Sequence, residues 1–196
     1  MTGVAGILLA AGEGARLGRA KALIEVGGQT LAERGVAMLR DGGADPVLVV
    51  TGAVPVRVAA AEVVHNPGWR SGMGSSLTAG LAAARSDAAR SDAAVIALAD
   101  QPLIGAAAVG RLIAAFAAGA TVAVATYDGQ PRNPVLIARE HWPAVIESAR
   151  GDIGARAFLR AHPDLVTRVE CGDTGQPDDV DTPEELAVLI ARFTAK

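Results

Sequence analysis

Short, uninterrupted apolar runs alternate with helical stretches from one end of this chain to the other. A run such as Val4–Ala10 contains no polar side chain, which indicates a strand that is covered on both faces. Strands that alternate with helices favour a three-layer α/β/α, Rossmann-like fold built on a mostly parallel (mixed) sheet. We therefore expect strands at Val4–Ala10, Pro46–Thr51, Glu62–His65, Ala94–Ala99, Thr121–Thr126, Pro134–Ala138 and Val166–Glu170. The expected helices are Thr30–Arg40, Val56–Ala61, Ser75–Arg85, Ala106–Ala118, His141–Ala149, Ala155–Ala161 and Pro183–Phe193.

Composition narrows the classes of function. The 196 residues fit one domain, predicted to span 1–196, and the 51% hydrophobic content excludes a disordered chain. The net charge of −3, without a run of Lys or Arg, argues against a nucleic-acid partner. The single cysteine, Cys171, excludes an internal disulfide and a multi-cysteine zinc site. The N-terminus lacks the basic start of a signal peptide, and no apolar run has membrane-spanning length, so we expect a cytoplasmic protein without a membrane partner.

The loop after the first expected strand has the composition of a phosphate cradle. Gly12, Gly14 and Gly18 let the backbone turn sharply, so that successive amides can point at one anion. Arg16 and Lys21 add cationic groups of the kind that phosphate oxygens favour. A tight turn with solvated basic residues is the plainer interpretation of the same pattern.

Two better-known nucleotide motifs do not match this loop. A Walker loop ends in Gly-Lys followed by Ser or Thr, which is absent here. The dinucleotide fingerprint requires a glycine where Leu17 stands, and an acidic residue near the end of the second strand, where Thr51 and Gly52 are found. A dehydrogenase is therefore disfavoured.

A second glycine-rich segment follows the third expected strand. Gly72 and Gly74 lead into Ser75 and Ser76 at the start of an expected helix. Serine at this position is a common helix cap, whereas the free amides of a helix N-terminus also bind anions or base edges. No Gly-x-Ser-x-Gly elbow is present, so the pattern disfavours a serine nucleophile.

Carboxylates follow at two further places. Asp100 comes directly after the apolar run that ends at Ala99, a position where Mg²⁺–nucleotide sites are commonly built, although it could also cap a helix. Near the C-terminus, Asp179 and Asp181 precede Thr182, which is a good helix start whatever the function. The local pattern favours a metal ligand only for Asp100.

Three segments together resemble one family. They are Leu9-Ala-Ala-Gly-x-Gly-x-Arg-x-Gly-x-x-Lys21, Asn66-Pro-x-Trp-x-x-Gly-Met-Gly-Ser-Ser-Leu77 and Leu98-Ala-Asp-x-Pro102. They are similar to the motifs of nucleotidyltransferases of the molybdenum cofactor type, and the second resembles the cytidylyltransferase branch. The resemblance implies Mg²⁺-dependent transfer of CMP from CTP to the terminal phosphate of molybdopterin, with release of pyrophosphate.

The resemblance also implies roles for individual residues. Arg16, Lys21 and Asp100 would be catalytic, and Asp100 and Asp181 would hold Mg²⁺, with Asp179 as the alternative second ligand. Ser76 is the expected contact to the base. The nucleotide-binding residues implied are Leu9, Ala10, Ala11, Gly12, Gly14, Arg16, Lys21, Gly72, Gly74, Ser75 and Ser76.

Single positions bear on the choice of substrate. Ala11 stands where the guanylyl branch has glycine, and its methyl group would narrow a base pocket against a purine. Arg132 stands where glycine is usual near the second substrate, and Asp152 matches a family segment but could also cap the following helix.

The alternatives to this function are a guanylyltransferase using GTP, a transferase for another phosphate acceptor, and a maturation protein that carries molybdopterin without transfer. A molybdenum hydroxylase is the client that the resemblance implies.

Overall fold

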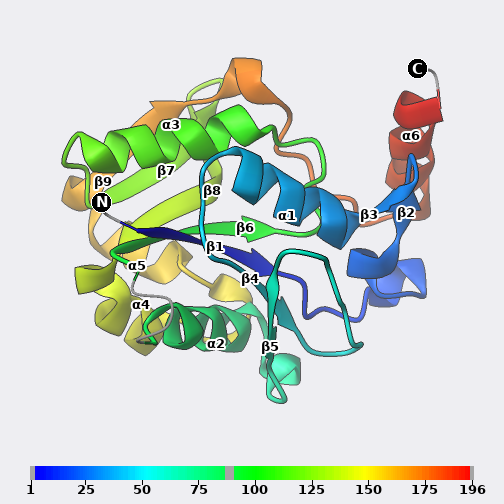
Figure 1. Ribbon diagram of the computed structural model, residues 1–196, viewed down its shortest axis with the longest axis horizontal. Coiled ribbons are helices and arrows are strands. Elements are labelled where there is room, and N and C mark those ends of the chain that lie inside the picture. Colours follow the sequence, from blue (N-terminus) through cyan, green and yellow to red (C-terminus); the bar gives the residue numbers. More distant parts are fainter. Residues whose placement is uncertain (1–2, 87–90, 195–196) are drawn as a thin grey trace.

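The computed structural model describes residues 3–86 and 91–194 and has the expected three layers, a twisted sheet with helices on both faces (Figure 1). The main sheet has the strand order β5-β4-β1-β6-β8-β7-β9. Every neighbouring pair is parallel except the two pairs made by β8, so the sheet is mostly parallel but mixed, as predicted. The strands are β1 (Val4–Leu9), β4 (Val47–Thr51), β5 (Glu62–His65), β6 (Ala93–Leu98), β7 (Val122–Tyr127), β8 (Gln130–Ala138) and β9 (Val166–Glu170).

Two groups of helices cover the two faces of this sheet, each over its own apolar cluster (Figure 1). Among the described helices, none is both long and apolar enough to cross a lipid bilayer. One face carries α1 (Leu31–Asp41) and α3 (Ala106–Ala117), and the other carries α2 (Met73–Ala84), α4 (Trp142–Ser148) and α5 (Arg156–Ala161). Short 3₁₀ helices lie at Ala15–Leu17, Lys21–Leu23, Trp69–Ser71, Arg139–His141, Gly151–Ile153, Pro163–Leu165 and Gly172–Thr174.

A third, smaller apolar cluster lies beside the sheet. There α6 (Pro183–Thr194) packs against the hairpin formed by β2 (Glu25–Val26) and β3 (Gln29–Thr30) (Figure 1). Arg34 of α1 contacts both the hairpin and α6. Its Nε donates to the Val26 carbonyl at 3.1 Å, and its guanidinium lies 4.0 Å from the centre of the Phe193 ring. The buried members of this cluster are Ile24, Val26, Leu31, Val180, Leu186 and Leu189.

Two local expectations need correction. The helix expected at Val56–Ala61 is wrong, because residues 56–58 form no regular secondary structure and residues 59–60 form a turn in which Ala60 has a φ of 62°. Its valines follow a period of two, with Val54, Val56 and Val58 all packed against the core, and branching at Cβ favours extended backbone. The hairpin of β2 and β3 was not expected, because each of its strands has only two residues.

Candidate active site

The carboxyl ends of the parallel strands meet at one edge of the sheet, where the loops after β1, β5 and β6 surround a cavity of about 480 Å³. Ligands of open α/β sheets bind at this edge, and the volume suits a small molecule. The cavity is lined by Leu9, Ala10, Ala11, Gly12, Glu13, Gly14, Lys21, Ala22, Trp69, Arg70, Gly72, Met73, Ser76, Leu98, Ala99, Asp100 and Asp152.

The glycine-rich loop after β1 curls back on itself. Gly14 and Gly18 flank a 3₁₀ turn and both adopt left-handed backbone, with φ of 68° and 67°. A Cβ on Gly14 would lie 2.0 Å from the Arg19 carbonyl oxygen, so this position requires glycine twice over. The curl brings Lys21 back into the wall of the cavity.

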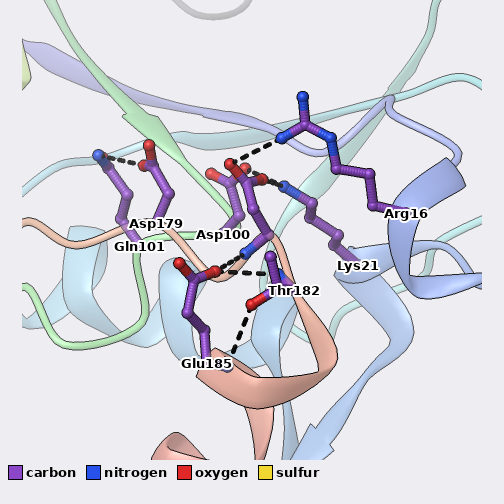
Figure 2. A network of polar contacts seen from close by, with 8 residues as sticks. Arg16, Lys21, Asp100, Gln101, Asp179, Thr182 and Glu185 are labelled. Carbon is purple, nitrogen blue, oxygen red and sulfur yellow. Dashed lines mark hydrogen bonds and ion pairs between the residues drawn. The ribbon is translucent and has the colours of Figure 1, made fainter.

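Four charged side chains from three distant segments meet beside this loop, and we call them the charged cluster: Arg16, Lys21, Asp100 and Asp181. The Lys21 ammonium donates to Asp100 Oδ2 at 2.8 Å and also to Asp181 Oδ1. Arg16 lies 3.6 Å from the other oxygen of Asp181, and its side chain is 76% exposed. Figure 2 shows Arg16 and Lys21 pointing from the glycine-rich loop toward Asp100. Two carboxylates that converge on one cation form a donor set suited to Mg²⁺, which commonly uses one or two carboxylates together with phosphate oxygens.

The pKa values within this cluster reflect its pairing. Burial by itself would lower the pKa of Lys21, but the hydrogen bonds and charges of Asp100 and Asp181 outweigh it, so the pKa is raised. The hydrogen bond from Lys21 lowers the pKa of Asp181, helped by the charge of Arg16. Both partners are therefore held in their charged forms.

Asp181 is held in place by the turn that starts α6. Its own amide and that of Thr182 donate to Glu185 Oε2 at 2.7 and 2.9 Å, while the Glu185 amide donates to Thr182 Oγ1 at 3.2 Å. The Val180 amide also donates to the Asp100 carbonyl at 2.9 Å, which joins the two acidic segments. Glu185 was not among the expected site residues, although Thr182 followed three residues later by glutamate is the signature of a capping box.

Asp179 is engaged elsewhere. Its Oδ1 accepts a hydrogen bond of 2.8 Å from Gln101 Nε2, and in Figure 2 it faces Gln101 rather than Lys21. Burial raises the pKa of Asp179, and the nearby charge of Asp100 adds to the effect. Of the two aspartates that the sequence left open, Asp181 is the one that shares Lys21 with Asp100.

On the other side of the cavity, a neutral hydrogen-bond network replaces the ion pairs, and we call Asn66, Ser75 and Ser76 the serine cluster. The buried Asn66 donates from Nδ2 to Ser75 Oγ at 2.9 Å and to Ser76 Oγ at 3.1 Å. Ser76 lines the cavity, whereas the Ser75 hydroxyl donates to the carbonyl of Gly72 at 2.8 Å. Asn66 was part of the motif that we recognised but not an expected site residue.

The start of α2 fits closely against the 3₁₀ turn of residues 151–153. A Cβ on Gly72, which has a φ of 104°, would lie 2.4 Å from the Gly151 carbonyl carbon, and one on Gly74 would lie 2.8 Å from that of Ala149. Asp152 accepts a hydrogen bond of 3.3 Å from the Met73 amide and lines the cavity. It therefore caps α2, not the helix that follows it in sequence.

The expected site residues divide into those that line the cavity and those that do not. Leu9, Ala10, Ala11, Gly12, Gly14, Lys21, Gly72, Ser76 and Asp100 line the cavity. Arg16, Gly74, Ser75 and Asp181 stand behind or beside its lining, and Arg132 is exposed on β8, where it donates to the Pro131 carbonyl. Trp69 and Arg70, which the sequence analysis did not single out, line the cavity with the guanidinium 4.5 Å from the indole centre.

Comparison with known families gives one match over most of the chain. Residues 6–166 match the model of the MobA-like NTP transferase domain. The nicotine blue oxidoreductase of Paenarthrobacter nicotinovorans is 39% identical over 95% of this chain and 96% of its own length. The probable molybdenum cofactor guanylyltransferase of Opitutus terrae is 40% identical over 64% of this chain and 62% of its own.

Solved structures agree on the architecture. The crystal structure of the homologue of Mycobacterium tuberculosis Rv0371c from Mycobacterium sp. strain JC1 superposes with a TM-score of 0.82. It is 30% identical in sequence, and the match covers 98% of this chain and 97% of that one.

Proposed function

This chain belongs to the MobA-like NTP transferase family and is a nucleotidyltransferase, and from that premise we propose that it transfers CMP from CTP to the terminal phosphate of molybdopterin. One observation carries the proposal: Lys21 meets two carboxylates beside a glycine-rich loop, at the wall of a cavity of about 480 Å³. A site for a nucleoside triphosphate and its divalent cation requires such groups: backbone amides and a cation for the phosphates, and carboxylates for the metal. The cytidylylated cofactor would then pass to a molybdenum hydroxylase.

The charged cluster supports a role for Mg²⁺. Asp100 and Asp181 come from separate segments, and the space between them already accommodates a cationic group, the Lys21 ammonium. Among the described residues no group of three or more His, Cys, Asp or Glu side chains is placed to hold a metal, so phosphate oxygens would complete the shell. When bound, Mg²⁺ would neutralise charge on the reacting phosphates.

The chain's own residues would hold and orient the triphosphate. The amides of the loop from Gly12 to Gly18 would bind its oxygens, and Lys21 and Arg16 would offset its negative charge. An oxygen of the acceptor phosphate then attacks the α-phosphorus in line, the bond to the bridging oxygen breaks, and pyrophosphate leaves. No covalent nucleophile is needed, and Cys171 is unsuited to be one because it is buried and burial raises its pKa.

Ala11 is our candidate for the choice of base. It lines the cavity and is 7% exposed, so its methyl group takes up space that glycine would leave open. One methyl group is worth about 1–3 kcal/mol of discrimination. We expect Ala11→Gly to narrow the gap between CTP and GTP affinity, and unchanged selectivity would rule the position out.

An oxidoreductase is a second candidate, favoured by the relative of that name, which matches 95% of this chain at 39% identity. The same cavity would then take the nucleotide portion of a redox cofactor. The absence of a dinucleotide fingerprint, with Leu17 in place of glycine, speaks against a nicotinamide dinucleotide. An assay that monitors the absorbance of NADH or NADPH, with a quinone-type dye as electron acceptor, separates the two candidates. A transferase would leave the absorbance unchanged, because it does not oxidise either dinucleotide.

The principal test is equilibrium binding of CTP, GTP, ATP and UTP with and without Mg²⁺, followed by pyrophosphate release in the presence of molybdopterin. We expect Mg²⁺-dependent preference for CTP and release of pyrophosphate only with the acceptor. A preference for GTP would assign the guanylyl reaction instead. Turnover with another phosphate acceptor alone would reassign the second substrate, and a protein that binds molybdopterin but no nucleotide would be a carrier.

A further inference from the structure

Lys21 occupies the one position that both carboxylates of the charged cluster share. Its Nζ donates to Asp100 Oδ2 at 2.8 Å and to Asp181 Oδ1, and its side chain is only 20% exposed. The ion pairs thus join a residue of the glycine-rich loop to residues 79 and 160 positions away. In this arrangement the ammonium is the counter-ion of the acidic pair.

We propose that Lys21 is an exchangeable counter-ion: it neutralises Asp100 and Asp181 when no divalent cation is bound, and it moves to the phosphates of the nucleotide when a cation takes its place. This rests on the proposed function, because the same two carboxylates serve as metal ligands. It goes further, because it assigns Lys21 a second task as a competitor of the metal.

The exchange follows from the geometry. A Mg²⁺ held between the two carboxylates would lie where the Lys21 ammonium now lies, and two cations at one position repel each other. Metal binding to the nucleotide-free protein therefore includes the work of breaking two ion pairs. Arg16 does not compete in this way, since it faces only the outer oxygen of Asp181 at 3.6 Å and is 76% exposed.

The position of Lys21 also allows the movement. The residue begins the short 3₁₀ helix Lys21–Leu23 at the end of the glycine-rich loop, and it lines the cavity. A lysine stem has four carbons and many rotamers, so the ammonium can swing from the carboxylates toward the loop amides without a change in the backbone. A triphosphate in the loop would draw it in that direction, and by linkage the triphosphate and the cation would each strengthen the binding of the other.

The test is calorimetric titration of MnCl₂ into the nucleotide-free protein, with no activity required. Lys21→Met removes the charge and keeps the length of the side chain, so we expect it to bind Mn²⁺ roughly tenfold more tightly than the wild type. Lys21→Arg keeps a competing cation and is expected to bind at the wild-type level. Lys21→Gln, whose amide can still donate to a carboxylate, is measured in parallel as a second neutral variant.

Two controls tie the gain to the acidic pair. The double variant Lys21→Met with Asp100→Asn should lose the tight Mn²⁺ site. Without metal, Lys21→Met should melt below the wild type, because two carboxylates then face each other without a counter-ion, and MnCl₂ should raise its Tm more than that of the wild type.

The outcomes separate this inference from the function on which it rests. Tighter Mn²⁺ binding by the neutral variants, lost in the double variant, supports the exchange. Equal or weaker binding by both neutral variants overturns it, and Mg²⁺-dependent CTP turnover by the wild type would still uphold the proposed function. If neither the wild type nor any variant binds Mn²⁺, with or without CTP, the metal pair and the exchange both fail.

Discussion

The two sides of the cavity are built on different principles. The charged cluster gathers long, partly exposed side chains from three distant segments and holds them by ion pairs. The serine cluster takes Asn66, Ser75 and Ser76 from one short segment and joins them by neutral hydrogen bonds, of which the one to Ser76 is buried. Glycines fit this segment against the neighbouring backbone. Ion pairs can exchange partners as charged ligands enter, whereas a packed neutral network keeps one shape. One side is therefore suited to bind charge, and the other keeps a fixed shape, which under the proposed function would recognise the base.

The largest expected effect comes from removing one carboxylate of the charged cluster. If the proposed function holds, Asp100→Asn should lower pyrophosphate release roughly a thousandfold, or about 4 kcal/mol, because one of the two proposed metal ligands is lost. Thermal melting should show a folded protein, since asparagine can still accept from Lys21. Asp179→Asn is the matched control, because that aspartate faces Gln101. An equal loss of pyrophosphate release in both variants would contradict the different roles assigned to Asp100 and Asp179.

Beside the serine cluster, we expect substitutions to change stability through packing. The Cβ of Gly74→Ala would lie 2.8 Å from the backbone carbon of Ala149, and backbone cannot yield cheaply. Overpacking of this kind costs roughly 2 kcal/mol, so the Tm should fall by about 4–8 °C. Gly12→Ala is the control, because a Cβ there meets nothing within 4 Å and should leave the Tm unchanged. A Tm that is the same in both variants would contradict the close fit.

A smaller change tests the neutral network itself. Ser76→Ala removes one of the two acceptors of the buried Asn66 amide and the only hydroxyl of the serine cluster that lines the cavity. The loss of one such hydrogen bond is worth about 1 kcal/mol, which weakens CTP binding roughly fivefold. Ser75→Ala should affect binding less, since Ser75 stands behind the lining. A reversed order in the measured Kd values would assign the base contact to Ser75.

The smallest expected effect concerns pH and the start of α6. Hydrogen bonds from the amides of Asp181 and Thr182 hold the pKa of Glu185 below its ordinary value of 4.5. A lowered folded-state pKa stabilises the protein above the unfolded value, and the stabilisation is lost as the pH falls through the folded value. The Tm of the wild type should thus exceed that of Glu185→Gln at neutral pH, and the difference should vanish in acid. A difference that is constant with pH would assign the effect to packing.

Much of the fold could be predicted because the central strands are continuous apolar runs. Val4–Leu9 and Ala93–Leu98 are buried along almost their whole length, so the sequence pattern and the burial agree. The segment from Val56 to Ala61 misled us because alanine and valine content alone does not distinguish a short helix from extended chain. Its period of two, which also includes Val54, was the informative signal.

The candidate site could be predicted only in its parts. The loops that carry Lys21 and Asp100 follow apolar strands, which a sequence shows directly, whereas Asp152 enters the cavity from a turn that follows α4. That Lys21 bonds to both Asp100 and Asp181 could not be predicted, because the sheet order and the docking of α6 bring these residues together. Asn66 and Glu185 were missed for a related reason, since their importance lies in the side chains and amides that they orient.

The late position of Asp181 in the sequence has a consequence for biosynthesis. Every strand of the main sheet, from Val4 to Glu170, is synthesised before this residue. The residues that line the cavity are likewise made before Asp181, so in a chain that stops short of it Lys21 has only Asp100 as a partner. A polypeptide that ends there would contain the whole lining of the cavity but not the second carboxylate or α6, and under the proposed function we expect it to bind a divalent cation more weakly.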